Sequence, residues 1–128
     1  MIKFLRFGNG ALLNVNDVRE IWKGVNLYRR HSGKYSEGNE RVIKATIEIQ
    51  ANGERCTFID VRAYAPLKED ETWNNRTGED SGAVRRINDI LDTMITILVD
   101  KMNDEDEKII SIDTRFLEDA VKEEVERG

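Results

Sequence analysis

A stripe of apolar residues runs through residues 83–102 at intervals of three and four, which places them on one face of a helix. Its members are Val84, Ile87, Leu91, Met94, Ile95, Leu98 and Met102. Ile90, Ile97 and Val99 widen this face to about half of the circumference, because each residue turns the helix by roughly 100°. So wide a face needs more than one partner. We therefore expect it to contact a sheet and also a second helix or another subunit.

Alternating apolar residues before this helix predict β-strands joined by tight turns. Asn9-Gly10 and Asn52-Gly53 lie between such runs, and Asn-Gly favours a two-residue hairpin turn because both residues tolerate positive φ. The expected strands are residues 2–7, 11–15, 18–28, 41–50 and 54–63. A two-residue turn at Asn52-Gly53 predicts these cross-strand pairs: Ile49 with Cys56, Ile47 with Phe58, Ala45 with Asp60, and Ile43 with Arg62.

The end of the chain predicts a second helix that begins at Asp113 or Thr114 and ends near Arg127. Its expected inner face consists of Leu117, Val121 and Val125, with help from Phe116 and Ala120. The isoleucines at 109, 110 and 112 either add a strand or cover the core.

These patterns together predict an α+β fold in a single domain, residues 1–128. Residues 1–66 form an antiparallel sheet of about five strands, and residues 83–128 form two helices packed on it. Residues 67–82 form a long polar loop between the two parts, and Ser81 is the expected N-cap of the first helix.

Composition narrows the class of protein. The chain has 128 residues, 39% hydrophobic and 35% charged, and no apolar run reaches the roughly 20 residues that span a bilayer. One cysteine, Cys56, suits a reducing compartment, so we expect a cytoplasmic protein without a membrane partner. One histidine, His31, rules out a Cys/His zinc cluster, and we expect neither a metal nor a cofactor.

Charge is divided unevenly along the chain. Residues 1–66 carry 11 Lys/Arg and 7 Asp/Glu, whereas residues 67–128 carry 9 and 18. One interpretation is that the helices simply present solvated carboxylates to water. The other is that the β-rich half offers a basic surface to an anionic ligand.

The first candidate site combines Trp73, Arg76, Arg85 and Arg86. Two arginines in the first turn lie against the positive end of the helix, which is mildly unfavourable. A bound anion would offset that cost, since backbone amides and guanidinium groups together suit a phosphate, and Trp73 would stack on a base. The alternative is that both arginines pair with carboxylates nearby in the sequence, namely Glu79, Asp80 and Asp89, while Trp73 packs on the sheet.

A second cluster interleaves basic and aromatic residues between the third and fourth strands. It contains Tyr28, Arg29, Arg30, His31, Lys34 and Tyr35. Such interleaving is typical of a nucleotide contact surface, and the alternative is a solvated hairpin tip.

A third group, Asp60 with Glu48 and Arg62, resembles a carboxylate site on a sheet. Its spacing also fits an ion pair at the edge of the core. No nucleophile with a matching base and orienting group is present in the sequence, so an enzyme is not the leading interpretation.

The opening of the chain, Ile2-Lys3-Phe4 through Asn9-Gly10 to Val18 and Ile21, resembles the start of many small proteins of low-GC Gram-positive bacteria and their phages. The layout, with strands first and two helices last, is similar to that of the phage anti-Thoeris proteins. Those proteins are oligomers that sequester cyclic nucleotide signals without cleaving them. The resemblance implies a phage-encoded anti-defence protein that acts in the host cytoplasm.

The leading functional hypothesis is a non-enzymatic homo-oligomer that sequesters a small phosphorylated, nucleotide-like ligand. Its expected ligand-binding residues are Trp73, Arg76, Arg85 and Arg86, with Arg29, Arg30 and His31 from a neighbouring subunit. Nucleic acid itself is not an expected partner. The alternatives are an acidic protein–protein inhibitor or adaptor of a nucleic-acid-binding protein, which acts through residues 104–107, and a small metal-dependent nuclease that uses Asp60 and Glu48.

Overall fold

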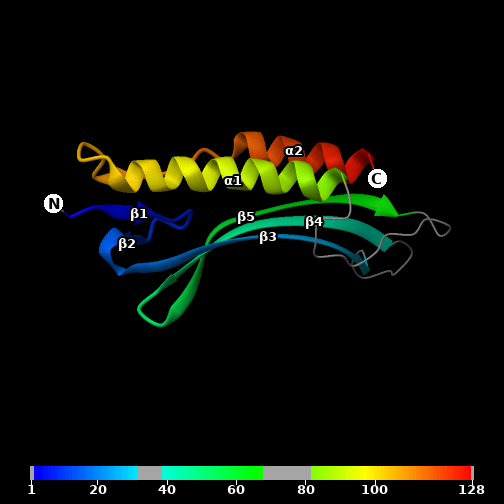
Figure 1. The fold of residues 1–128 in the computed structure, drawn as a ribbon. Helices are drawn as coiled ribbons and strands as arrows, with labels where there is room; N and C mark the ends of the chain where they lie inside the picture. The colour runs from blue at the N-terminus through cyan, green and yellow to red at the C-terminus, as the bar shows by residue number, and fades with distance from the viewer. Residues whose placement is uncertain (1, 32–38, 68–81, 128) are drawn as a thin grey trace.

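The computed structural model describes residues 2–31, 39–67 and 82–127, which form an α+β fold with two helices and two three-stranded sheets (Figure 1). The elements in chain order are β1 (Phe4–Arg6), β2 (Leu12–Asn14), the 3-10 turn η1 (Val15–Asp17), β3 (Val18–His31), β4 (Asn39–Ala51), β5 (Glu54–Leu67), α1 (Gly82–Asn103), β6 (Ile109–Ile110) and α2 (Arg115–Arg127). Both helices cover the same face of the long sheet, and in the part of the chain that the structure describes no helix covers the other face, which we call the open face.

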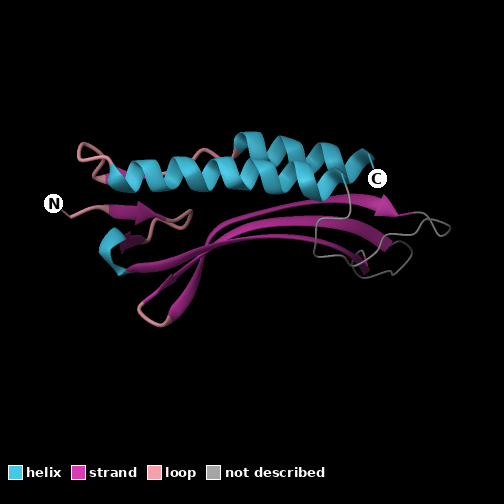
Figure 2. Ribbon diagram, in the orientation of Figure 1, coloured by secondary structure: helices cyan, strands magenta, loops and turns pink. Residues whose placement is uncertain are grey.

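The prediction of one sheet of about five strands was wrong, because the strands divide into two sheets (Figure 2). Between β2 and β3, the Asn14 side chain accepts a hydrogen bond of 2.9 Å from the Asn16 backbone N–H and closes η1, which turns the chain out of the first hairpin. The short sheet has the order β2-β1-β6. Its β6 strand comes from the isoleucine run and pairs in parallel with β1, Leu5 lying opposite Ile110.

The long sheet has the order β3-β4-β5 and is antiparallel throughout. Its β4–β5 turn has the predicted conformation, with φ of 53° at Asn52 and 80° at Gly53. The first predicted pair, Ile49 with Cys56, is confirmed.

The other three predicted β4–β5 pairs were wrong, because the register shifts by one residue between Ile47 and Glu48. Ile47 lies opposite Ile59, Ala45 opposite Val61 and Ile43 opposite Ala63. This bulge adds Phe58 to one strand. It lets Phe58 be buried while it also turns Ile59 and Val61 toward the helices. Without it, every later residue of β5 would present its other face, and Asp60 and Arg62 would enter the core.

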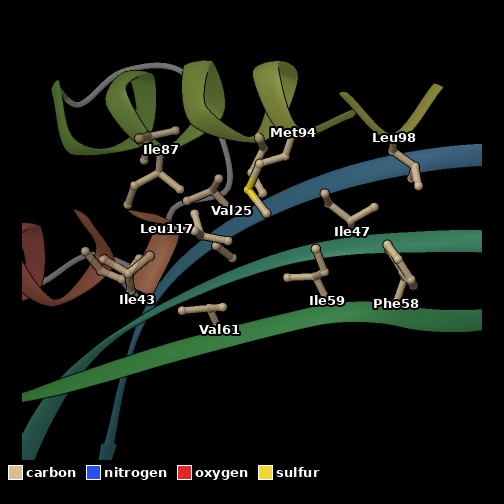
Figure 3. Close-up of a cluster of buried hydrophobic side chains, with 14 of the residues drawn as sticks. Val25, Ile43, Ile47, Phe58, Ile59, Val61, Ile87, Met94, Leu98 and Leu117 are labelled. Carbon is tan, nitrogen blue, oxygen red and sulfur yellow. The ribbon is translucent and has the colours of Figure 1, made fainter. Parts of the chain in front are cut away.

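The core lies between the helices and the long sheet (Figure 3). α1 buries five of the seven residues of the predicted stripe, namely Val84, Ile87, Leu91, Met94 and Leu98. The other two, Ile95 and Met102, are half-buried. Of the residues expected to widen the stripe, Ile90 is half-buried, whereas Ile97 and Val99 are 43% and 39% exposed.

α2 buries four of its five predicted inner residues: Leu117, Ala120, Val121 and Val125. Phe116 was predicted wrongly and is 70% exposed. It precedes Leu117 by one position, and the turn of about 100° between neighbours directs its ring away from the sheet. Asp113 begins the helix by accepting a hydrogen bond of 2.9 Å from the Arg115 backbone N–H. The hydrogen bonds from the Arg115 side chain lower the pKa of Asp113 to about 2.

The neighbours Phe116 and Leu117 therefore make a matched test of the packing. We predict that Leu117→Ala lowers the free energy of unfolding by about 2–5 kcal/mol, because it leaves a cavity in the core. Phe116→Ala should change it by no more than about 0.5 kcal/mol. Urea denaturation of both variants measures these values, and equal losses would contradict the orientation of α2.

Candidate binding site

Six arginines gather at one end of the molecule, where β3 ends, β4 begins, α1 begins and α2 ends (Figure 1). They are Arg29, Arg30, Arg41, Arg85, Arg86 and Arg127. We call this group the arginine end. Four separate elements contribute to it, so only the folded chain brings these guanidinium groups together.

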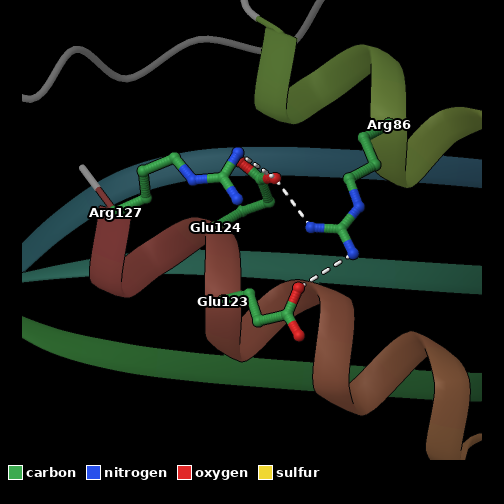
Figure 4. A network of polar contacts seen from close by, with 4 residues as sticks. All are labelled: Arg86, Glu123, Glu124 and Arg127. Atoms are coloured by element: carbon green, nitrogen blue, oxygen red, sulfur yellow. Dashed lines mark hydrogen bonds and ion pairs between the residues drawn. The ribbon is translucent and has the colours of Figure 1, made fainter.

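Arg86 crosses from α1 to two carboxylates of α2 (Figure 4). Its guanidinium donates to Glu124 and to Glu123, each over 2.9 Å. Glu124 is only 6% exposed and also lies 3.3 Å from Arg127. The hydrogen bonds to Glu124 and then to Glu123 raise the pKa of Arg86. Two of the anions that offset its place in the first helical turn thus come from α2, whereas the predicted partners Glu79 and Asp80 lie outside the described residues.

Arg41 ties the sheet to the end of α2. Its Nε donates to the Val125 carbonyl over 2.5 Å, and its Nη2 donates to the Glu126 carbonyl over 2.8 Å. These are carbonyls of the last helical turn, where a cation is favourable. Arg41 lies directly opposite Arg29 in the sheet. Like charges in directly opposite positions repel each other. The guanidinium group of Arg41 instead contacts carbonyl oxygens of α2, which carry a partial negative charge.

Arg29 and Arg30 are neighbours in the sequence but belong to opposite faces of the sheet. Alternation places Arg29 on the helix-facing side with Val25 and Leu27. Arg30 lies on the open face, where it donates to Glu40 over 3.0 Å and its guanidinium carbon lies 4.0 Å from the centre of the Tyr64 ring. Arg29 and Arg85 also engage other groups of the protein.

The structure brings Arg29, Arg30, Arg85 and Arg86 to one end of the same molecule, whereas the binding hypothesis took Arg29 and Arg30 from a neighbouring subunit. It also places Arg29 and Arg30 on opposite faces of the sheet. The backbone of His31 ends β3, while its side chain lies outside the described residues. Trp73, Arg76 and Ser81 also lie outside them, so their predicted roles stay predictions.

Asp60 and Glu48 are each paired with an arginine. Arg62 holds Asp60 through two hydrogen bonds of 2.9 and 2.8 Å, which lower the pKa of Asp60. Arg55 lies 3.4 Å from Glu48 and 3.7 Å above the Trp22 ring. Within residues 2–31, 39–67 and 82–127, no three His, Cys, Asp or Glu side chains are placed to hold a metal ion.

Sequence reasoning missed the residues that hold the arginine end together, above all Arg41 and Glu124. Both interrupt a buried pattern: Arg41 occupies a helix-facing position of β4, and Glu124 borders the apolar stripe of α2 next to Val125. A charge at such a position signals a buried or capping partner, and this signal is visible in the sequence.

Comparison with protein-family models, curated proteins and solved structures finds no match to this chain. Among the helices that the structure describes, none is long and apolar enough to cross a membrane.

We predict that Arg86→Ala destabilises the protein, because it removes the partner that α1 provides to the buried Glu124 carboxylate. Arg115→Ala is the matched control, since Arg115 pairs with exposed Asp113 at the other end of α2. The urea midpoint should fall for Arg86→Ala and stay close to wild type for Arg115→Ala. If both midpoints stay unchanged, the Arg86–Glu124 contact does not hold the two helices together.

The Asp60–Arg62 pair predicts a pH dependence. Because the pKa of Asp60 is lowered from 3.8 in the folded protein, its stabilising contribution is complete at neutral pH and is lost as the pH falls below that value. The difference in unfolding free energy between wild type and Asp60→Asn should therefore shrink between pH 6 and pH 3. A difference that stays constant or grows on acidification would show that the pair does not form.

Proposed function

We propose that this chain is a non-enzymatic protein that binds a small phosphorylated, nucleotide-like ligand at the arginine end. The observation that supports the proposal is that arginines of the sheet and of both helices lie at one end of the molecule, where β3 ends and α1 begins. Guanidinium forks match the geometry of phosphate oxygens, and an aromatic ring offers a stacking surface to a base.

The proposed ligand contacts are Arg85 at the start of α1 and Arg29 on the helix-facing side of β3, with Trp73, Arg76 and His31 as further candidates. Arg30 lies on the opposite face of the sheet and is not one of them. The first turn of α1 adds the positive end of a helix, which favours an anion. Arg86 and Arg41 hold the helices and sheet in place around these residues through α2. A phosphate would compete with the groups that Arg29 and Arg85 now engage.

The distribution of charge favours a small anion over a long nucleic acid. Strands β3, β4 and β5 carry eight Lys/Arg and five Asp/Glu, whereas residues 82–127 carry seven and thirteen. A polyanion that extended from the arginine end over the helices would meet a net negative surface. A compact ligand that stays at this end avoids it.

The test is isothermal titration of the purified protein with inorganic phosphate, ATP, ADP-ribose and a cyclic dinucleotide. We predict that at least one of the nucleotides binds and is recovered intact afterwards. Arg29→Ala and Arg85→Ala should each weaken that binding by about tenfold or more, since each loses a charge-assisted contact. Arg115→Ala removes an equal charge far from the site and should bind as wild type does.

Two results would contradict the proposal. One is the absence of binding to every member of this panel. The other is binding that Arg29→Ala and Arg85→Ala leave unchanged. Recovery of a cleaved nucleotide would instead show that the protein is an enzyme.

The exposed acidic connector between α1 and β6 supports a second candidate, a protein–protein adaptor. Asp104, Glu105 and Asp106 are exposed at the end of the molecule opposite the arginine end. A basic partner would bind there, and its binding should weaken steeply as salt is added. If the affinity of a binding partner does not change with salt concentration, the connector does not have this role.

A further inference from the structure

β3 is a 14-residue strand at the edge of the long sheet. In the part of the chain that the structure describes, no strand pairs with its outer side. Long edges of this kind pair readily with another strand, and proteins usually shorten, bend or charge them. The β3 edge carries charged residues, Glu20 and Arg30 among them, and on the same open face it presents Trp22, which is 38% exposed, and Tyr28. Trp, Tyr and Arg are the residue types that most often anchor protein interfaces.

We propose that β3 pairs antiparallel with β3 of a second copy, with the two Val25 residues facing each other across a two-fold axis. In this register Glu20 lies opposite the partner's Arg30, and Trp22 lies opposite the partner's Tyr28. Symmetry makes each of these pairs occur twice, as an isologous interface requires. The two long sheets then join into one sheet of about six strands, with both helical layers on the same side.

This register is selected by its side-chain pairs. A shift of the register by one residue would place helix-facing residues of one copy opposite open-face residues of the other. A pairing centred on Gly24 places Glu20 opposite the partner's Tyr28 and Trp22 opposite the partner's Asn26. A pairing centred on Asn26 leaves Glu20 beyond the end of the partner strand. Only the pairing centred on Val25 joins both opposite charges and both aromatic rings.

Groups on the helix-facing side of β3 are compatible with this pairing. Val25 is apolar and nearly buried, and it meets its own copy at the axis. Lys23 would otherwise place a charge beside the partner, but its Nζ binds Asp92 of α1 over 2.5 Å. That contact holds the ammonium group against the same chain.

The other edge of the long sheet, β5, is less suited to strand addition. Pro66 lies in it and lacks the N–H that a ladder needs. Glu118, Lys122 and Glu126 of α2 line the cavity of about 510 Å³ beside β5, so charged side chains flank the path of an added strand. These features are the usual protection of an edge, and β3 contains no proline.

Charge reversal tests the proposal directly. Wild type should have twice the 14.8 kDa mass of the chain in light scattering coupled to size exclusion. Glu20→Arg places Arg opposite the partner's Arg30, and Arg30→Glu places Glu opposite the partner's Glu20, so each variant alone should be a monomer. An equimolar mixture of the two variants should form a heterodimer, because each interface pair again joins opposite charges.

The mixture separates the interface from effects within one chain. Arg30→Glu also loses the contact with Glu40, and mixing cannot restore that contact. Lys44→Glu is the control: it reverses a charge on the open face of central strand β4 and should remain a dimer. A monomeric wild type, single variants that stay dimeric, or a mixture that stays monomeric would each overturn the proposal. Far-ultraviolet circular dichroism confirms that the monomeric variants are folded. The result does not depend on the proposed ligand.

Discussion

The apolar stripe of α1 packs on β3 and β4, and this burial orients the remaining elements, with α2 covering β4 and β5 on the same face. Leu91 and Leu98 are fully buried in the same core cluster as Ile47 and Ile49, and each such side chain contributes roughly 1.5–3 kcal/mol. Because α2 lies on the same face, no helix that the structure describes covers the opposite face of the sheet. On that face the Trp22 ring contacts Arg55 and the Tyr64 ring contacts Arg30.

Polar contacts then fix how the two helices meet the sheet at the arginine end. Arg86 joins α1 to Glu123 and Glu124, and Arg41 joins β4 to the last carbonyls of α2. Both contacts are made by arginine, which is also the residue type that would bind a phosphate ligand. The arginine end therefore has two roles in our proposal: Arg41 and Arg86 hold the elements together, and Arg29 and Arg85 contact the ligand.

Local periodicity was enough to predict both helices, the hairpin turns and the α+β class, because each depends on residues close in the sequence. The bulge at Phe58 was not predictable from turn chemistry, since it depends on how much of β5 the helices can cover. The parallel pairing of β6 with β1 joins residues about a hundred positions apart, which no local pattern encodes. Phe116 was wrongly assigned to the inner face of α2, because apolar character alone does not show which side of the first helical turn faces the sheet.

The candidate site was predicted in part. Arginines at the ends of two predicted elements indicated an anion, but the partners of Arg86 lie in α2, and only the tertiary fold brings Glu124 within its reach. In the same way, the division of Arg29 and Arg30 between two faces follows from strand alternation once β3 is known to extend to His31. The predicted strand ended three residues earlier, so this division was not visible.

Native mass spectrometry of the protein purified from a bacterial host tests most directly whether it is a dimeric binder of a phosphorylated ligand. It reports the number of subunits and any retained molecule in one spectrum. We predict a species of twice 14.8 kDa that carries additional mass in the range of a nucleotide. A bare species of 14.8 kDa, unchanged when the nucleotide panel is added, would contradict both the pairing through β3 and the binding at the arginine end.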